Sequence, residues 1–253
     1  MSDKNKVAII TGGTRGIGYG IATCLANKGF DIVIASTNEK AAQTSAAAIA
    51  KEAGVEALGI ACDVTQQVQI DAMIEQTLTH FGQIDILVNN AGICPFVDIM
   101  EIDEAVFRKT LDTNLTGAFL CTQRVARKMI SREKGGRIIF ITSLCVNVAG
   151  ATLGDYAASK AGMHMLMKSF AIALGPHGIT CNAVAPGMIL TDMTRHHWEK
   201  PENAEFIKGR VPAGRIGTPE DIGNAVAMLC SDESSYINGV GLIVDGGHQT
   251  VCT

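Results

Sequence analysis

The sequence predicts an α/β fold, a single domain in which a doubly wound sheet of about seven parallel strands is flanked by helices. Three observations support this prediction. Short apolar runs without alternation recur along the chain, as is typical of strands buried on both faces of a sheet. Segments with helical periodicity separate these runs. Turns rich in glycine and asparagine follow the strands, and such sheets bind ligands at the carboxyl ends of their strands.

Composition and charge exclude several classes of protein. The chain has 253 residues, of which 47% are apolar, enough for the core of one large domain. The net charge of −4 and the lack of basic clusters argue against nucleic acid as a partner. No apolar run approaches the roughly 20 residues of a membrane span, and the polar N-terminus is not a secretory signal. The eight scattered cysteines have no CxxC spacing, so we expect reduced core thiols in a cytoplasmic protein.

The first expected strand leads directly into a glycine-rich turn. Val7–Ile10 is an apolar run, and the turn Thr11–Gly18 separates it from a helical pattern that ends near Gly29. A strand, a glycine turn and a helix form the context in which backbone amides cradle a diphosphate. The spacing is G-x-x-x-G-x-G rather than G-x-G-x-x-G, so a tight turn without a ligand is the alternative.

The second expected strand, Asp31–Ala35, ends in small polar residues. A fold that prefers NAD usually has an acidic residue here to bind the ribose hydroxyls, and none occurs before Glu39. Ser36 and Thr37 leave room for a 2′-phosphate, and Arg15 of the glycine turn would supply a charge. We therefore favour NADP(H), with NAD(H) possible. The alternative is a solvated Arg15 and a helix cap at Ser36 and Thr37.

Further strands and helices alternate to the end of the chain. We expect helices at Asn38–Ala53, Gln67–Phe81 and Asp103–Arg132, and strands at Ala57–Ala61, Ile84–Val88, Arg137–Ile141, Ile179–Val184 and Leu242–Val244. Asn114 lies inside a helical region, where asparagine has low propensity. From the residues alone, a side chain that faces solvent is the favoured interpretation of Asn114.

Tyr156 and Lys160 are the strongest candidates for chemistry. Four residues apart in a helical pattern, they share one helix face. A nearby ammonium favours a phenolate, so Lys160 is expected to lower the pKa of Tyr156 and make it a general acid/base. Ser143, at the end of the fifth strand, has enough following chain for its hydroxyl to meet that of Tyr156 at one carbonyl oxygen. An ordinary helix face is the alternative for the pair taken alone.

The segment Met188–Arg215 is the least regular part of the chain. It contains Trp198 and the pair His196-His197. Adjacent histidines in a strand point to opposite faces, and no acid or cysteine completes a ligand set, so we expect no metal site. A lid over the strand ends, with Trp198 as a hydrophobic contact, is the favoured interpretation.

Taken together, these motifs resemble those of the short-chain dehydrogenase/reductase family, whose members have a Rossmann-type fold. The resemblance covers nearly the whole chain and implies a cofactor half (about 1–135), a catalytic half (about 136–253) and a substrate lid (about 188–215). It rests on Thr11–Gly18, Asp63-Val64, Asn89–Gly92, Asn114, Ser143, Tyr156 with Lys160, and Pro186-Gly187 followed by Thr191.

The resemblance implies a role for each matching position. Tyr156 is the implied proton donor and acceptor, Lys160 lowers its pKa and binds the nicotinamide ribose, Ser143 orients the substrate oxygen, and Asn114 holds a water. The implied cofactor-binding residues are Gly12, Thr14, Arg15, Gly16, Ile17, Gly18, Ser36, Thr37, Asp63, Val64, Asn90, Ala91, Gly92, Tyr156, Lys160, Pro186, Gly187 and Thr191. The expected substrate-binding residues are Cys94, Phe96, Ser143, Cys145, Asn147, Leu153, Met188 and His196.

The substrate class stays open between two alternatives. The whole chain resembles 3-oxoacyl-carrier-protein reductases, which makes a ketone on an acyl carrier protein the favoured substrate. The C-terminal part also resembles sugar 1-dehydrogenases, the runner-up. A carrier protein would need a basic patch, for which Arg127, Lys128 and Arg132 are candidates. A sugar would need hydrogen-bond partners such as Asn147, Asp155 and His196.

Two further expectations concern partners and catalysis. Family members are usually tetramers, which implies a homotetramer built on the helices Asp103–Arg132 and Tyr156–Leu174. A regulatory protein that binds NADP(H) without catalysis is the different-class alternative. The presence of both Tyr156 and Lys160 argues against it.

Overall fold

The computed structural model contains one sheet of seven parallel strands in the order β3-β2-β1-β4-β5-β6-β7. It describes residues 5–191, 194–195, 205, 207 and 209–250. The strands are β1 Val7–Thr11, β2 Asp31–Ser36, β3 Ala57–Ala61, β4 Ile86–Asn89, β5 Gly136–Ile141, β6 Ile179–Pro186 and β7 Gly241–Val244. The predicted doubly wound fold is confirmed, and each predicted strand is present within two residues of its expected bounds.

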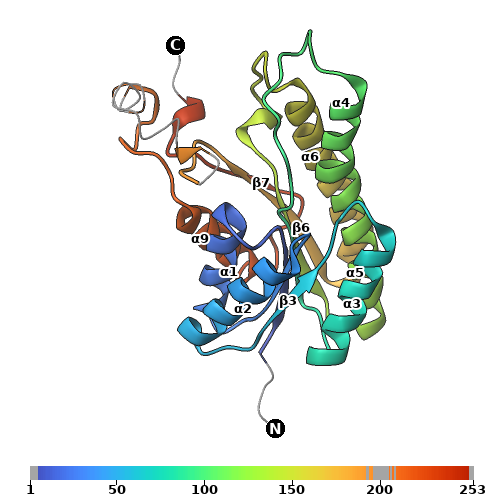
Figure 1. Cartoon of the computed structure of the whole chain (residues 1–253). Coiled ribbons are helices and arrows are strands. Elements are labelled where there is room, and N and C mark those ends of the chain that lie inside the picture. The colour runs from blue at the N-terminus through green and yellow to red at the C-terminus, as the bar shows by residue number, and fades with distance from the viewer. Residues whose placement is uncertain (1–4, 192–193, 196–204, 206, 208, 251–253) are drawn as a thin grey trace.

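Helices cover both faces of the sheet. They are α1 Gly16–Ala26, α2 Glu39–Ala53, α3 Gln67–Phe81, α4 Glu104–Leu111, α5 Gly117–Arg132, α6 Gly154–Leu174 and α9 Pro219–Cys230, with the short turns η2 Leu144–Val146, η3 Gly175–His177 and η4 His248–Thr250. Figure 1 shows α1, α2 and α9 on one side of the sheet and α3, α5 and α6 on the other. None of the helices within the described ranges is long and apolar enough to cross a membrane.

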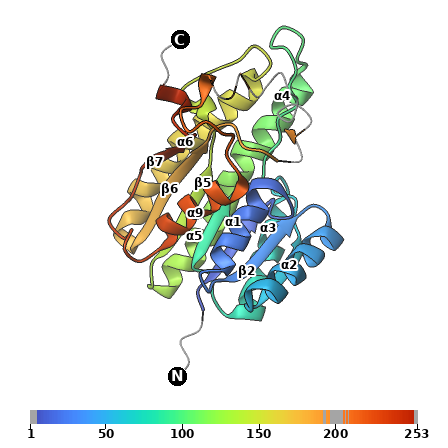
Figure 2. The ribbon, with the colours of Figure 1, turned by 90° about the vertical axis from the view of Figure 1, so that its left-hand side faces the viewer.

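The alternation of side chains along each strand divides the core in two. In β1, Val7 and Ile9 belong to the cluster beneath α3, α5 and α6, whereas Ala8 and Ile10 belong to the cluster beneath α1, α2 and α9. All four side chains are at most 1% exposed. Figure 2 looks onto the second of these layers. Because both faces are covered, the strands have the unbroken apolar runs from which they were predicted.

The region Asp103–Arg132, predicted as one helix, contains a five-residue π-helical segment. The segment η1 Asp112–Thr116 joins α4 to α5 without a break in the helical backbone. A π-helical turn inserts an extra residue and rotates the side chains that follow. Asn114 lies in this segment and is completely buried. The interpretation of Asn114 as a solvent-facing residue is therefore wrong.

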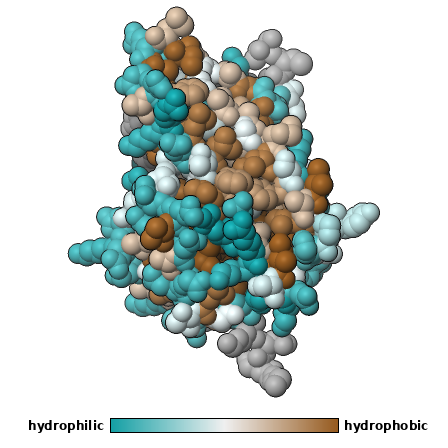
Figure 3. All heavy atoms as spheres, turned by 90° about the vertical axis from the view of Figure 1, so that its right-hand side faces the viewer, coloured by the Kyte–Doolittle hydropathy of each residue, from teal (hydrophilic) through white to brown (hydrophobic). Residues whose placement is uncertain are grey.

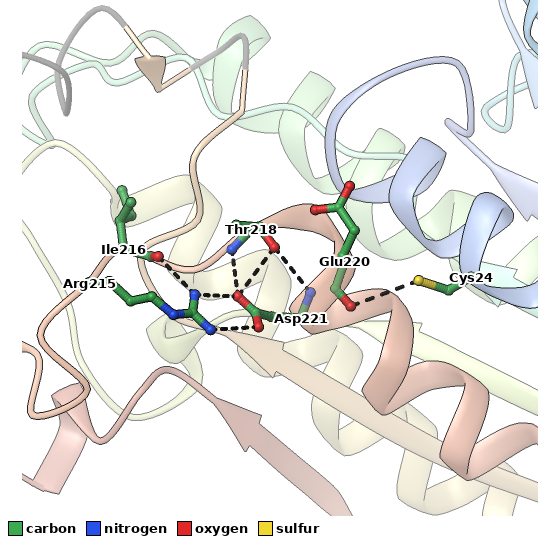
Figure 4. Close-up of polar contacts among 6 residues, drawn as sticks. All are labelled: Cys24, Arg215, Ile216, Thr218, Glu220 and Asp221. Carbon is green, nitrogen blue, oxygen red and sulfur yellow. Dashed lines mark hydrogen bonds and ion pairs between the residues drawn. The ribbon is translucent and has the colours of Figure 1, made fainter.

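Helix α9 was not predicted, although its start has a clear signal. Thr218 and Asp221 form a capping box, and Pro219 occupies the first turn. Asp221 also accepts two hydrogen bonds from the Arg215 guanidinium, at 2.7 and 2.8 Å (Figure 4). The helix packs closely on α1, because a Cβ at Gly223 would lie 2.5 Å from the sulfur of Cys24.

The cysteines that the structure describes are all free thiols. Four of them, Cys62, Cys121, Cys181 and Cys230, are buried as predicted. The remaining described cysteines, Cys24, Cys94 and Cys145, are partly exposed, so the prediction of core thiols does not hold for them.

Candidate active site

Tyr156 and Lys160 project from the first two turns of α6 toward the end of β5. The Lys160 side chain is 3% exposed, and its Nζ lies 5.6 Å from the centre of the Tyr156 ring. Nζ donates a hydrogen bond of 2.7 Å to the carbonyl of Ile141, the last residue of β5. The helix and the sheet together hold the ammonium beside the phenol, as the spacing of the two residues predicts.

Ser143 lies beside Tyr156 but comes from a different element of the fold. It follows β5 in an extended conformation and begins the turn η2, where its hydroxyl accepts a hydrogen bond from the amide of Cys145 at 3.2 Å. The Ser143 side chain also interacts with the Tyr156 hydroxyl by hydrogen bonding. The structure thus brings together the two hydroxyls that the sequence places on separate elements.

The pKa of Tyr156 differs from the sequence-based expectation. Burial raises it above its usual value, and the hydrogen bond with Ser143 opposes this effect only in part. The same burial lowers the pKa of Lys160 to about 8. Both groups lose hydration together, and the Lys160 ammonium is directed to the Ile141 carbonyl rather than to the phenol oxygen. The expectation that Lys160 lowers the pKa of Tyr156 is therefore not met.

Asn114 connects the β4 loop to α6. Its Oδ1 accepts from the amide of Ile93 at 2.8 Å, and its Nδ2 donates to the Ile93 carbonyl at 2.9 Å and to Ser159 Oγ at 3.0 Å. Ser159 in turn donates to the carbonyl of Tyr156 at 2.7 Å. Asn114 therefore fixes two elements of the site and leaves few of its own hydrogen-bonding positions free.

The glycine-rich turn fits a diphosphate. Gly12 and Gly16 have φ of +67° and +54°, which side chains rarely tolerate, and a Cβ at Gly18 would overlap the carbonyl of Gly12. The turn leads into the N-terminus of α1, which has no side-chain cap, so the amides that a helix leaves unpaired in its first turn could bind a diphosphate. Asn90 supports the turn, since its Nδ2 donates to the carbonyls of Thr11 and Gly12 at 2.9 and 3.0 Å.

Thr37, directly after β2, and Arg15, in the glycine-rich turn, are both exposed to solvent. The cap of α2 is Asn38, whose Oδ1 accepts from the amide of Ala41 at 3.0 Å, so a cap formed by Ser36 and Thr37 is excluded. A hollow beside this cap is lined by Asn38, Lys40, Ala41, Thr44 and Ser45. Sequence reasoning missed Lys40, a cation in the first turn of α2, which lines this hollow and follows Thr37 closely in the chain. The sequence pattern that could have revealed it is a lysine in the first turn of the helix that follows β2.

The other predicted cofactor residues are distributed along the same edge of the sheet. Asp63 is held by Thr65, whose amide and hydroxyl donate to its carboxylate at 2.9 and 2.8 Å. Thr191 lies against the glycine turn, because a Cβ at Gly16 would be 3.5 Å from it. The rest lie at or just beyond the ends of the strands. Pro186 ends β6, Ile17 lies in the first turn of α1, and the others lie in the turns: Thr14, Val64, Ala91, Gly92 and Gly187.

The predicted substrate residues surround Tyr156 only in part. Cys94 and Cys145 lie close enough to influence each other and Lys160 electrostatically, and burial raises the pKa of Cys94 to about 11. Phe96 is 55% exposed with φ of +56°, an uncommon backbone conformation for an aromatic residue. Asn147 is exposed, and Leu153 and Met188 are partly exposed.

The prediction that Asp155 could bind a sugar is wrong. It is completely buried and accepts a hydrogen bond from Thr110, so it is not exposed to a substrate. The predictions for His196, His197 and Trp198 lie outside the described residues, as does much of the expected lid. Within the described residues, no group of three or more metal-binding side chains occurs.

Comparison with known proteins gives close matches over nearly the whole chain. A family model described as "Enoyl-(Acyl carrier protein) reductase" matches residues 12–249. An L-rhamnose 1-dehydrogenase (NAD(P)(+)) of Azotobacter vinelandii is 39% identical over 246 residues, covering 96% of both chains. The 3-oxoacyl-[acyl-carrier-protein] reductase FabG of Escherichia coli is also 39% identical, over 251 residues that cover 99% of this chain and all of the relative.

Solved structures match equally well. A short-chain type dehydrogenase/reductase from Mycobacterium marinum has a TM-score of 0.91 at 35% identity, covering 98% of both chains. A gluconate 5-dehydrogenase from Burkholderia cenocepacia, solved with NADP and tartrate, has a TM-score of 0.92 at 36% identity and covers 98% of this chain and 96% of that one.

Proposed function

This protein belongs to the short-chain dehydrogenase/reductase family and is an NAD(P)-dependent oxidoreductase, and from that premise we propose that it oxidises a free sugar at the anomeric carbon with NADP⁺. Tyr156 serves as the acid/base. This proposal reverses the order of the two substrates favoured by the sequence, and the reason lies on α5.

The observation that carries the proposal is the pairing of cations along α5. Lys128 forms an ion pair with Glu75 at 2.8 Å, and Arg132 forms one with Asp85 at 3.1 Å. Two of the three cations expected to receive an acidic carrier protein are thus neutralised by carboxylates of the same chain. Surface cations attract an acidic protein partner through the positive potential that they create around them. A carboxylate paired with each cation reduces that potential. A small neutral substrate needs no field of this kind.

The residues of the site support the family's reaction. The cofactor cradled by the glycine turn would accept or supply the hydride. Ser143 donates a hydrogen bond to the substrate oxygen, and Tyr156 takes the hydroxyl proton during oxidation or returns it during reduction. Lys160 is protonated below about pH 8, and its ammonium, 5.6 Å from the centre of the Tyr156 ring, would offset part of the cost of forming the phenolate at this buried position. Asn114 keeps the β4 loop and α6 in register.

A preference for NADP(H) over NAD(H) rests on the end of β2. Arg15 is exposed above the glycine turn, Lys40 borders the hollow at the start of α2, and no carboxylate occupies positions 36 and 37. Two cations and small hydroxyl groups suit a 2′-phosphate, whereas a carboxylate there would suit the free ribose hydroxyl of NAD. Comparing kcat/KM for the two cofactors tests this preference, and equal or better use of NAD⁺ would contradict it.

Reduction of a 3-oxoacyl thioester is the second candidate. It is favoured by the 39% identity to FabG over 251 residues, which equals the identity to the rhamnose enzyme. Arg127 is exposed on α5 and remains available to an acidic partner.

One assay panel separates the two candidates. Purified protein is given several aldoses with NADP⁺ and, separately, acetoacetyl thioester with NADPH, with Tyr156→Phe as the matched control. The proposal expects aldose oxidation that is lost in the control and little reduction of the thioester. Thioester reduction without aldose oxidation would replace the proposal with the second candidate. Binding of NADPH without turnover of either class would revive the non-catalytic alternative.

We further propose that the protein assembles as a homotetramer. Met165 and Ile172, one face of α6, are 60% and 80% exposed. Apolar surface gathers on the side of the molecule that carries α3, α5 and α6 (Figure 3). Large exposed apolar areas usually mark interfaces. Light scattering after size exclusion measures the mass. A monomer at micromolar concentration would contradict the proposal.

A further inference from the structure

A second buried polar pair lies one helical turn from Asn114 and Ser159. The Thr110 hydroxyl of α4 lies 2.6 Å from Oδ2 of Asp155 in the first turn of α6. Both side chains are completely buried. Thr110 precedes Asn114 by four residues, and Asp155 precedes Ser159 by four, so the two contacts are successive steps between the same helices.

The Thr110–Asp155 contact joins α4 to α6 at a cost in stability. The second carboxyl oxygen, Oδ1, is also buried and has no hydrogen-bond partner among the described residues. A buried polar group without a partner destabilises the folded chain, and an apolar pair of similar shape would avoid that loss. Local features that sacrifice stability concentrate where function requires them. The position of Asp155 in the chain indicates what that function is.

Asp155 directly precedes Tyr156, and the two polar contacts hold that tyrosine from both sides. Asp155 is tied to α4 through Thr110, while the Tyr156 carbonyl accepts from Ser159, which Asn114 holds in turn. The π-helical segment begins directly after α4, so the main chain is irregular between the two contacts. The Thr110 contact adds a second restraint, next to that of Asn114, on rotation and sliding of α6 relative to α4.

We propose that Thr110 and Asp155 are positioning residues for the reaction, which fix the N-terminal turn of α6 so that the Tyr156 hydroxyl meets the substrate oxygen beside Ser143. The inference rests on the acid/base role of Tyr156 given under the proposed function. Reacting groups must be held within about 0.5 Å of the productive geometry, and displacement by about 1 Å can cost 10²-fold in rate. The effect belongs to turnover and not to cofactor affinity, because neither residue reaches the glycine turn.

Thr110→Val removes the hydroxyl and keeps the shape. We expect kcat to fall roughly tenfold while the Kd for NADPH stays within about twofold. Thr110→Ser, which keeps the hydroxyl, should restore kcat. Asp155→Asn, which keeps an acceptor oxygen, should lose less kcat than Asp155→Leu. The double variant Thr110→Val with Asp155→Leu should have the same kcat as Asp155→Leu alone, because the two residues act as one unit. Thr77→Val is the matched control. Thr77 is a fully buried threonine of α3, and within the described part of the chain its hydroxyl bonds only to Met73 of the same helix, at 2.8 Å.

The Tyr156→Phe background separates positioning from general damage. Tyr156→Phe has no hydroxyl at this position. If Thr110 acts only by positioning that hydroxyl, Thr110→Val should leave the residual turnover of Tyr156→Phe unchanged. An equal fold loss in both backgrounds, or a kcat within twofold of wild type in Thr110→Val, would overturn the inference. So would a loss equal to that of Thr77→Val. If Thr110→Val does not fold, the order of Thr110→Ser, Asp155→Asn and wild type decides by the same measurements. Near-normal turnover of Tyr156→Phe itself would instead refute the proposed function.

Discussion

Replacing Lys160 by methionine should stabilise the folded chain by an amount that depends on pH. The ammonium is almost completely buried, and folding lowers its pKa from 10.5 to about 8. Between these values the unfolded chain binds one proton more than the folded chain, so the stability of the wild type rises with pH through this window. Methionine has a similar length and carries no proton, so its advantage is greatest near neutral pH.

The expected magnitude follows from the shift. A change from 10.5 to about 8 corresponds to about 3 kcal/mol at about 1.4 kcal/mol per pKa unit. Packing changes and the lost hydrogen bond to Ile141 also alter the stability of the variant, but they do not titrate. The informative quantity is therefore the change with pH of the difference between variant and wild type. It should shrink by roughly 2 kcal/mol between about pH 7 and pH 9.5.

Urea unfolding at a fixed protein concentration measures this difference. Lys168→Met, two turns further along α6, is the matched control, since Lys168 is an exposed lysine of the same helix. Its difference from wild type, measured over the same range of pH, is the baseline for the Lys160→Met difference. A Lys160→Met difference that is constant over the same range, or that grows with pH, would refute the reasoning. The expected outcome is a variant that is more stable at neutral pH and inactive, as is common where a site sacrifices stability for function.

Three further predictions use other parts of the site. Tyr156→Phe should lower kcat by about 10²–10⁴-fold and leave NADPH binding, measured by fluorescence titration, nearly intact; a near-normal kcat would exclude the assigned role. Thr37→Asp should reduce kcat/KM for NADPH more than for NADH, because its carboxylate repels the 2′-phosphate; an equal loss with both cofactors would contradict this. Hydrogen bonding from Arg215 lowers the pKa of Asp221 to about 2, so its stabilising effect is complete above about pH 4 and is lost as the pH falls toward 2. In thermal melts Asp221→Asn should therefore be less stable than wild type at pH 6 and no different near pH 2, and a constant deficit would argue against this interpretation.

The sheet and most helices were predictable because local patterns determine them. Apolar runs such as Val7–Ile10 have a single plausible environment in a covered parallel sheet, and the glycine turn after them needs positive φ wherever it occurs. The convergence of Ser143 and Tyr156 follows from the same logic, since both come after the carboxyl end of β5.

What escaped prediction depends on contacts between distant segments. The burial of Asn114 requires both the π-helical segment and the Ile93 loop, which no periodicity reveals. The cations of α5 looked free because Glu75 and Asp85 lie more than forty positions earlier in the chain. Asp155 was expected to bind a sugar because its actual partner, Thr110, lies 45 positions earlier in the chain. Helix α9 was overlooked although its capping box is local, so that omission was avoidable.

The order of the strands has a consequence for how quickly activity appears after unfolding. The centre of the sheet joins segments far apart in the chain: Ile9 of β1 pairs with Leu87 of β4, and Ile138 of β5 pairs with Cys181 of β6. Pairings of such high contact order form slowly, whereas helices form within about a microsecond. Ser143 and Tyr156 come from the crossover that the β5–β6 pairing closes, and Asn114 comes from the crossover between β4 and β5, which pair directly. After dilution from denaturant, helical circular dichroism should therefore recover early and turnover late, so the regain of activity reports the rate at which the central strands assemble.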